Sequence, residues 1–340
     1  MNKTSTLQNN RISYLDFLRV LACLMVIFTH STMPAEASDG IYLSIMSLIS
    51  SPSSELFLTL SGAILLPIKS DFSSFYKKRF TKLLPPLIIW SIIYTFLVFF
   101  EGKIDLSMVF ERLIKIPFTP VVGVYWFMYV MIGLYLFAPF ISPWIKNATK
   151  KQLEVFLFIW IISLLMPYLN IFIPNIYNES GNYYWMLCNF SGFLGYWILG
   201  YYLRTYPIKI GLNLRWMLCL VGLLVYLIVL VILKINNFEM QPFFDNLQIG
   251  SALFVTIIFT IIQNLQIKQS NIISNIATCS FGIYLIHIII IRHIVWTFFE
   301  TSNINPIIET SIITIISFVA SLIVVKILSK LPFSKYIVGI

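Results

Sequence analysis

The chain has 340 residues, of which 59% are hydrophobic and only 11% charged, and its mean hydropathy is +0.87. An ordinary soluble domain carries about 25% charged residues, so this composition excludes a soluble protein and predicts an integral membrane protein. The formal net charge is +9, but the basic residues fall in short segments between apolar stretches, as in oriented membrane proteins. We therefore expect contacts with membrane lipids and no nucleic-acid partner.

Ten apolar stretches follow one another along the chain, each of about 17 to 25 residues, the length at which a helix crosses a bilayer. They lie near 13–33, 49–68, 83–100, 124–145, 153–173, 184–203, 214–233, 247–265, 276–298 and 307–329. The second is the weakest because SSPSSE interrupts it. The sequence thus predicts an all-α, polytopic membrane protein with about ten transmembrane helices in a single domain over 1–340. The longest connections are expected to be outer loops, at 34–48, 101–123, 174–183 and 234–246.

The distribution of basic residues predicts the orientation. Seventeen of the 23 Lys and Arg residues lie in the segments that share one side with both termini, and four lie on the other side. The remaining two, Arg19 and Arg292, fall within predicted spans. Cytoplasmic loops carry an excess of Lys and Arg, so both termini are predicted to be cytoplasmic, as an even number of spans requires.

The four cysteines all lie inside apolar stretches and show no CxxC spacing. This argues against disulfides and against a metal site, and it predicts that they are packing residues. They are Cys23, Cys188, Cys219 and Cys279.

The first span, LDFLRVLACLMVIFTHS, carries Asp16, Arg19 and His30. On a helix, Arg19 and His30 are about 16 Å apart along the axis and within roughly 20° of one face. Asp16 lies three residues before Arg19, within reach of the guanidinium. An unpaired charge near the bilayer centre costs on the order of 3 kcal/mol, so this face is expected to look into protein or water. The alternative is an Asp16–Arg19 pair that reaches the cytoplasmic surface, with His30 at the outer helix end.

Two further groups of polar residues lie within spans. Glu55, at the outer end of the second span, is expected at a depth similar to that of His30, where a carboxylate would orient the imidazole and raise its basicity. In SFGIYLIH, Ser280, Tyr284 and His287 form one helical stripe. An interhelical hydrogen bond is the alternative explanation for Tyr284 and His287.

Other polar and aromatic residues lie near predicted span ends. Tyr125, Trp126, Tyr129 and Tyr135 begin at an interface, and an aromatic belt explains most of them. Arg292 is expected to be an anchor or a substrate contact, and His293 has no evident partner. Lys77, Lys78, Arg79 and Lys82 directly precede a span with Pro85 and Pro86 near its start. This basic segment is an orientation signal that would also suit a ligand bearing several phosphates.

Taken together, these motifs resemble the acyltransferase 3 family of membrane acyltransferases. DFLRVLACLMVIFTH matches the first family pattern at Asp16, Arg19, Ala22, Val26 and His30. ELFLTLSG matches the second at Glu55, Phe57, Ser61 and Gly62, with Leu58 where a second Phe is usual. KKRFTKLLPP, YWFMYVMIGLYLFAP, GYWILGYYL and SFGIYLIH follow in the family order, with Lys82 where arginine is more usual. The resemblance covers roughly residues 11 to 330.

The resemblance implies a stand-alone enzyme of the bacterial inner membrane, similar to surface-polysaccharide O-acetyltransferases. Its donor would be acetyl-CoA or another acyl-CoA, without a further cofactor or metal, and its acceptor a hydroxyl of a surface glycan or lipid-linked sugar. Within it, Arg19 would orient the donor, Lys78, Arg79 and Lys82 would meet its phosphates, and His30 would act as general base with Glu55 holding the ring. Supporting roles fall to Asp16, Ser61, Trp126, Tyr284 and His287. Formation of a homo-oligomer is left open.

Three alternatives remain at this stage. Within the enzyme class, His30 or Ser61 would carry the acyl group covalently. A secondary transporter, or an exporter component for a polysaccharide precursor, would also have ten spans and intramembrane Arg, His and Glu. Gradient-dependent uptake without acyl transfer would favour that class. A scaffold of an export complex is the third alternative, and release of free CoA by purified protein would exclude it.

Overall fold

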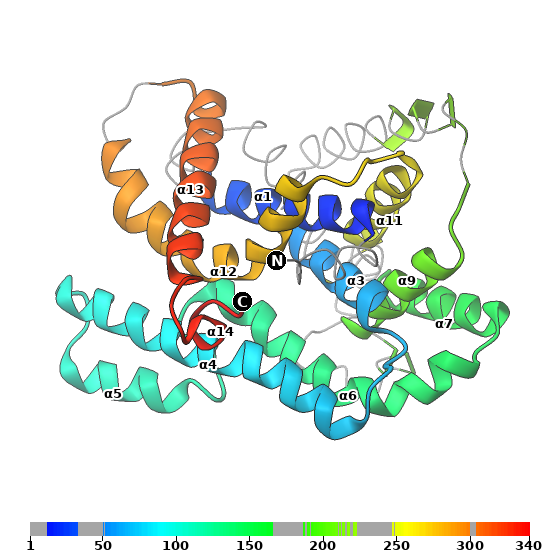
Figure 1. Cartoon of the computed structure of the whole chain (residues 1–340), viewed down its shortest axis with the longest axis horizontal. Helices are drawn as coiled ribbons and strands as arrows, with labels where there is room; N and C mark the ends of the chain where they lie inside the picture. The colour runs from blue at the N-terminus through cyan, green and yellow to red at the C-terminus, as the bar shows by residue number, and fades with distance from the viewer. Residues whose placement is uncertain are drawn as a thin grey trace, which may run out of the picture. The chain divides into compact units, whose positions relative to one another are not determined.

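The structure is a computed structural model, and it describes residues 12–32, 50, 52–165, 186–187, 189–190, 192–209, 211, 213–214, 216–217, 220–222, 247, 249–299 and 304–340. All regular secondary structure within these residues is helical (Figure 1). The chain forms two compact units. The first comprises Met1–Ala22, Leu48–Pro67 and Trp144–Ser274, and the second comprises Cys23–Ser47, Ile68–Pro143 and Asn275–Ile340.

The helices of each unit are as follows. The first unit holds α3 (Ser53–Leu65), α7 (Lys150–Ser163), α9 (Leu194–Thr205) and α11 (Ile249–Asn264). The second holds α4 (Phe72–Phe100), α5 (Leu106–Lys115), η3 (Gly123–Tyr125), η6 (Ile291–Val295), η7 (Trp296–Phe298), α13 (Pro306–Leu328) and α14 (Ser334–Ile337). Three helices contain residues of both units: α1 (Ser13–Ser31), α6 (Trp126–Asn147) and α12 (Asn271–Ile290).

Five helical segments among the described residues are long and apolar enough to cross a membrane, which confirms a multi-pass, all-helical membrane protein. They are Ser13–Ser31, Phe72–Phe100, Gly123–Asn147, Asn271–Phe298 and Pro306–Leu328. The predicted spans at 49–68 and 247–265 correspond to shorter apolar helices, α3 and α11. The spans predicted at 153–173, 184–203 and 214–233 extend outside the described residues. Ten spans, cytoplasmic termini and a single domain over 1–340 therefore stay predictions.

Helix α4 begins eleven residues earlier than the predicted span at 83–100. Asp71 caps it, because its carboxylate accepts a hydrogen bond of 2.9 Å from the backbone N–H of Ser74. Pro85 and Pro86 therefore lie inside a helix of 29 residues rather than near its start. The basic segment before them is helical, so Lys78 and Lys82 lie one turn apart on the same side of α4.

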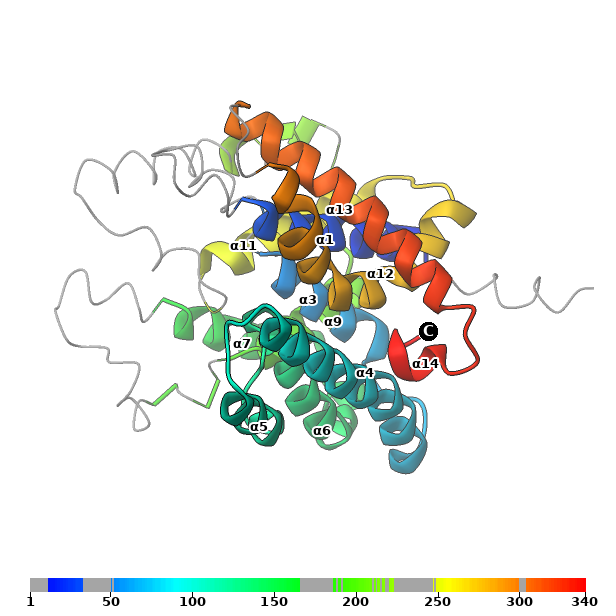
Figure 2. The same ribbon diagram turned by 90° about the vertical axis from the view of Figure 1, so that its left-hand side faces the viewer.

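The connection predicted at 101–123 contains a helix of ten residues, α5, which the sequence analysis did not predict. Asp105 caps this helix by accepting a hydrogen bond of 2.8 Å from the backbone N–H of Met108. Helix α5 runs beside α4 (Figure 2). Leu106, Phe110 and Ile114, spaced by four residues, form an exposed apolar stripe, whereas Val109 is buried.

The first unit is built around a close crossing of α3 and α9, which lie side by side (Figure 1). A Cβ atom on Gly200 would lie 1.8 Å from the carbonyl oxygen of Thr59, and one on Gly62 would lie 2.1 Å from that of Trp197. Only glycine allows two helix backbones to approach so closely. Arg204, at the end of α9, donates a hydrogen bond of 2.6 Å to the carbonyl oxygen of Ala63 near the end of α3.

In the second unit, the C-terminal helix α14 packs against α4 (Figures 1 and 2). The indole N–H of Trp90 donates a hydrogen bond of 2.8 Å to the carbonyl oxygen of Ile337. Gly339 has a φ of 72°, a conformation that side chains other than glycine rarely adopt. The contact between Trp90 and Ile337 holds the C-terminal residues against the part of α4 that follows its basic residues.

Candidate functional site

Helix α1 carries the three polar residues of the first motif in one uninterrupted helix, as predicted. Asp16 is 6% exposed and belongs to the first unit with Arg19, whose guanidinium nitrogen lies 3.8 Å from the Asp16 carboxylate. The hydroxyl of Ser274 donates a hydrogen bond of 2.8 Å to the other carboxylate oxygen of Asp16. The sequence offered no reason to single out Ser274, because 258 residues separate it from Asp16. This contact holds the carboxylate that faces Arg19.

His30 belongs to the second unit, where its ring faces that of His287 from α12. The two ring centroids are 5.4 Å apart with an interplanar angle of 37°. His287 is fully buried, and its Nδ1 lies 2.6 Å from the carbonyl oxygen of Tyr284. A carbonyl oxygen only accepts, so Nδ1 carries the proton and the lone pair of His287 is on Nε2. No residue of the described part of the chain bonds to that Nε2.

Two tyrosines fix α12 against η3 and thereby position His287. The hydroxyl of Tyr284 donates to the carbonyl oxygen of Val124, and the hydroxyl of Tyr125 donates to the carbonyl oxygen of Leu285 at 2.8 Å. Tyr284 thus makes an interhelical hydrogen bond, as the alternative explanation expects, whereas Nδ1 of His287 bonds within its own helix. Tyr125 is 0% exposed, so it is a buried clamp and not part of an aromatic belt.

The second family motif lies on α3 in the first unit. Glu55 is 0% exposed and Ser61 is half-buried. A carboxylate buried to this extent in an apolar helix is kept only where surrounding polar groups stabilise it or where it is protonated. The contact between Glu55 and His30 stays a prediction, as do the proposed roles of Glu55 and Ser61.

The predicted donor-binding residues lie on the first three turns of α4. Lys78 and Lys82 are exposed, while Arg79 is half-buried with its guanidinium 5.8 Å from the centre of the Phe75 ring. The ring holds Arg79 in place without neutralising it. With Lys77, these turns of α4 carry four cationic side chains and no acidic one, which leaves a positive surface there.

Trp126 starts α6 directly after the tyrosine clamp. It is half-buried and packs edge-on against Phe127, with ring centroids 6.2 Å apart. Its supporting role stays a prediction.

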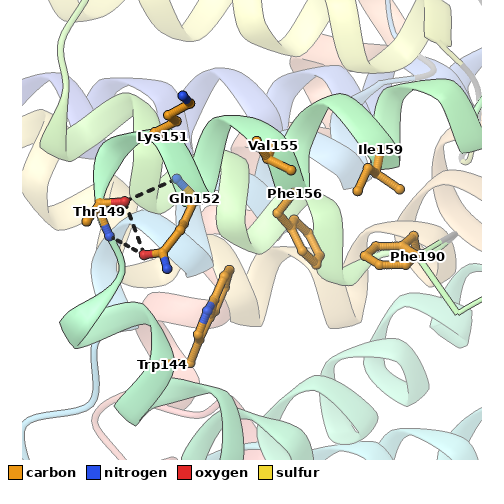
Figure 3. A pocket seen from close by; sticks show the side chains of 8 residues that line it. All are labelled: Trp144, Thr149, Lys151, Gln152, Val155, Phe156, Ile159 and Phe190. Carbon is orange, nitrogen blue, oxygen red and sulfur yellow. Dashed lines mark hydrogen bonds between the residues drawn. The ribbon is translucent and has the colours of Figure 1, made fainter.

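Two cavities lie within single units. In the first unit, a cavity of about 460 Å³ lies beside α7 and is lined mainly by Trp144, Val155, Phe156 and Phe190 (Figure 3). At its edge, Thr149 and Gln152 form the capping box that starts α7 (Figure 3). Most of the described lining is apolar, and its polar side chains are those of Thr149, Lys151 and Gln152.

In the second unit, a cavity of about 720 Å³ lies between α4, α5 and η6. Its charged lining consists of Glu101, Lys103, Arg112, Arg292 and His293. We call it the Arg292 cavity. No partner for His293 was evident from the sequence, but its Nδ1 pairs with the Glu101 carboxylate. Glu101 and Arg112 were missed because they lie in the segment predicted as a loop.

No group of three or more His, Cys, Asp or Glu side chains that would hold a metal ion is found among the described residues. Cys23 and Cys279 are buried free thiols, and the other two cysteines lie outside the described residues. The Sγ of Cys23 lies 3.9 Å from the carbonyl oxygen of Ser280.

Comparison with known proteins places this arrangement in a family. A family model described as an acyltransferase domain matches residues 12–326, nearly the whole chain. No curated protein and no solved structure matches the chain. The match includes Arg19 and His30 on α1, Glu55 on α3 and the histidine pair of α1 and α12. The chain therefore belongs to the acyltransferase 3 family and is a membrane acyltransferase.

Proposed function

We propose that this membrane acyltransferase moves an acetyl or similar acyl group from acyl-CoA to a hydroxyl of a surface glycan or lipid-linked sugar, in a bacterial inner membrane. The observation that carries the proposal is the His30–His287 pair, two facing imidazoles held by the tyrosine clamp in a chain of this family. A neutral imidazole is the side chain best suited to take a proton from a hydroxyl near neutral pH.

In the proposed step, His30 accepts the proton of the acceptor hydroxyl while the hydroxyl oxygen attacks the thioester carbonyl carbon. The new C–O bond forms, the C–S bond breaks, and the thiolate of CoA leaves. The proton then passes from the His30 imidazolium to the thiolate, which restores the neutral ring. Nothing is oxidised or reduced, and the step requires no metal.

His287 supports this role because of its tautomer. Its Nδ1–H is committed to the Tyr284 carbonyl, so Nε2 remains a hydrogen-bond acceptor beside His30. An acceptor there stabilises an N–H on the neighbouring ring when that ring becomes protonated. His287 is thus a positioning residue that favours the protonated form of His30 during transfer.

Covalent transfer through His30 or Ser61 is the alternative within the class. It predicts that protein incubated with radiolabelled acetyl-CoA, without acceptor, becomes labelled and that Ser61→Ala or His30→Ala removes the label. Direct transfer predicts no label on the wild-type protein. The same experiment therefore distinguishes the two mechanisms.

The donor site is tested on α4. Replacing Lys78, Arg79 and Lys82 together by alanine should weaken acetyl-CoA binding by about tenfold or more, because exposed contacts to phosphate contribute modestly but add up. The loss should be largest at low ionic strength, where screening is weakest. Equilibrium binding to purified protein at two salt concentrations measures both effects.

The matched control replaces Lys146, Lys150 and Lys151 by alanine. This removes the same number of charges from another segment that is predicted to be cytoplasmic. Its dissociation constant for acetyl-CoA should stay close to the wild-type value. If both triple variants weakened acetyl-CoA binding equally, the loss would follow from the change in net charge alone. The residues of α4 would then not belong to the donor site.

The activity itself is tested with purified protein reconstituted in lipid. Acetyl-CoA and a candidate glycan acceptor should together release free CoA, and mass spectrometry should find an added acetyl group on the glycan. Surface glycans of cells with and without the protein should differ by the same increment. Absence of both signals across acceptor classes would refute the proposed function.

A further inference from the structure

We propose that the Arg292 cavity is the acceptor subsite and that it takes a saccharide bearing a negative charge, either a carboxylate or a phosphate group. The inference rests on the proposed function, since it names the class of acceptor for that reaction. Every residue of the cavity belongs to the second unit, as do His30 and His287.

The shape of the cavity follows from a change in helix type. Helix α12 ends at Ile290 and continues as the π-helical turn η6 and then as the tighter helix η7. A π turn inserts extra residues into a helix and redirects its side chains, and such turns are frequent at functional sites. Arg292 and His293 of this turn, together with Trp296 at the start of η7, line the same cavity.

The charges of the cavity favour an anion. Lys103, Arg112 and Arg292 contribute three cationic side chains, against the single carboxylate of Glu101. That carboxylate is already engaged, because the ammonium of Lys103 lies 2.9 Å from one oxygen and His293 pairs with the other. Arg292 additionally lies 3.4 Å from the hydroxyl of Tyr94. The described lining therefore holds more cationic than anionic side chains, which favours binding of a carboxylate or phosphate.

The hydrogen bond from the Lys103 ammonium lowers the pKa of the Glu101 carboxyl below its ordinary value. Glu101 is therefore ionised at neutral pH and holds His293 in place. Among the described lining residues, the cationic side chains of Lys103, Arg112 and Arg292 outnumber this one carboxylate.

The other lining groups fit a sugar ring. Tyr94 and Trp296 present aromatic surfaces, and aromatic rings with polar tips suit ligands that are apolar on one face and hydroxylated at the edge. The indole N–H of Trp296 and Nε2 of His293 are buried and have no hydrogen-bond partner among the described residues. Both would bond to hydroxyl groups. The volume of about 720 Å³ lies within the range of small-molecule sites.

The cavity is also linked to the histidine pair. Arg292 follows His287 by five residues, about 7 Å along the helix axis. An anionic group held by Arg292 would therefore lie within about two helix turns of His287, and this closeness along one helical segment is the reason for placing the acceptor in this cavity.

Binding of defined probes tests the inference. The full-length protein, in nanodiscs of phosphatidylcholine and without acyl-CoA, is titrated with trigalacturonate, glucose 1-phosphate and maltotriose. We expect at least one anionic probe to bind about tenfold tighter than neutral maltotriose, since two charged contacts each contribute a factor of roughly three to five. Preference for trigalacturonate identifies a carboxylate ligand, and preference for glucose 1-phosphate identifies a phosphate ligand.

The variants change two cationic residues of the cavity, Lys103 in the connection before α5 and Arg112 on α5. Lys103→Gln combined with Arg112→Gln should abolish the preference for the anionic probe, and Arg112→Lys alone should retain most of it. Lys115→Gln is the matched control, because Lys115 lies on α5 one turn from Arg112, pairs with Glu111 and does not line the cavity. Equal binding of charged and neutral probes, or equal losses in the control and the double variant, would overturn the inference.

Two further measurements distinguish an acceptor subsite from a lipid-headgroup site, and failure of the subsite from failure of the proposed function. If phosphatidylglycerol added to the nanodiscs displaces the probe in a manner that requires Lys103 and Arg112, the cavity is a lipid-headgroup site and the inference fails. If the wild-type protein releases CoA with a neutral glycan but ignores the anionic probes, the proposed function stands and the subsite is wrong. Anionic binding without CoA release with any acceptor would instead refute the proposed function.

Discussion

Replacement of His30 by alanine should lower acyl transfer by at least about a hundredfold, because a general base contributes about 10²–10⁴-fold to the rate. Acetyl-CoA binding should stay near the wild-type value, since the proposed donor contacts lie on Arg19 and α4. The measurement is CoA release at saturating acetyl-CoA and acceptor, accompanied by a binding isotherm for the donor. Activity within about threefold of wild type would remove His30 from the proton transfer.

His287 provides the comparison for this variant. In His287→Asn, the side-chain amide can still donate to the Tyr284 carbonyl, but the acceptor that Nε2 offers beside His30 is lost. We expect a smaller loss of kcat than in His30→Ala, together with a shifted pH–rate profile. Loss of the fold in this variant would appear as a lower thermal midpoint, whereas a positioning role leaves that midpoint near the wild-type value.

Replacement of Gly200 by alanine should destabilise the first unit by about 3 kcal/mol or more, at the upper end of the effects of overpacking. The added Cβ would lie 1.8 Å from the Thr59 carbonyl oxygen and 2.9 Å from the backbone nitrogen of Ala63. Backbone atoms cannot move aside as a side-chain tip can, so α3 and α9 must separate. Thermal unfolding of the purified protein, followed by tryptophan fluorescence, measures the effect.

Gly133 is the matched control for Gly200. It lies inside α6, and nothing would lie within 4 Å of a Cβ added there. Gly133→Ala should stabilise the protein by roughly 0.5–1 kcal/mol, because alanine favours a helix interior over glycine. A lower free energy of unfolding in Gly200→Ala and a higher one in Gly133→Ala would demonstrate the close crossing of α3 and α9. An unchanged free energy of unfolding in Gly200→Ala would contradict it.

Apolar stretches and residue spacing in the sequence correctly predicted several helices and the residues that share a helix face. The apolar stretches at α1, α4, α6, α12 and α13 are long enough to span a bilayer, and each is a helix. The placement of Asp16, Arg19 and His30 on one helix follows from their spacing alone. The shared stripe of Tyr284 and His287 on α12 follows in the same way.

Helix α5 was missed although its signals are local. Asp105 is a good cap residue, and Leu106, Val109, Phe110 and Leu113 follow at helical spacing. A search for uniformly apolar stretches does not detect a helix whose other face is charged, such as one bearing Glu111 and Lys115. The early start of α4 was missed for the same reason, because its first turns are basic.

The contacts that build the candidate site could not be predicted, because they join distant parts of the chain. His30 and His287 are 257 residues apart, and Tyr125 and Leu285 are 160 residues apart. A sequence pattern indicates which face of a helix is polar but not which other helix it meets. Gly62 and Gly200 lie in the family motifs, but the sequence does not show why glycine is needed there. The structure explains it, because the backbones of α3 and α9 cross at these two residues.

The exposed stripe on α5 has a consequence for handling the protein. Leu106, Phe110 and Ile114 are 56%, 59% and 72% exposed, and such a stripe opposite charged residues is typical of a helix that rests in the headgroup layer. Arg112, on the same helix, lines the Arg292 cavity. Solubilisation in a micelle replaces the leaflet under that helix with a curved and loosely ordered surface. Acceptor recognition should accordingly respond to acyl-chain packing and bilayer curvature, and should be measured in a planar bilayer.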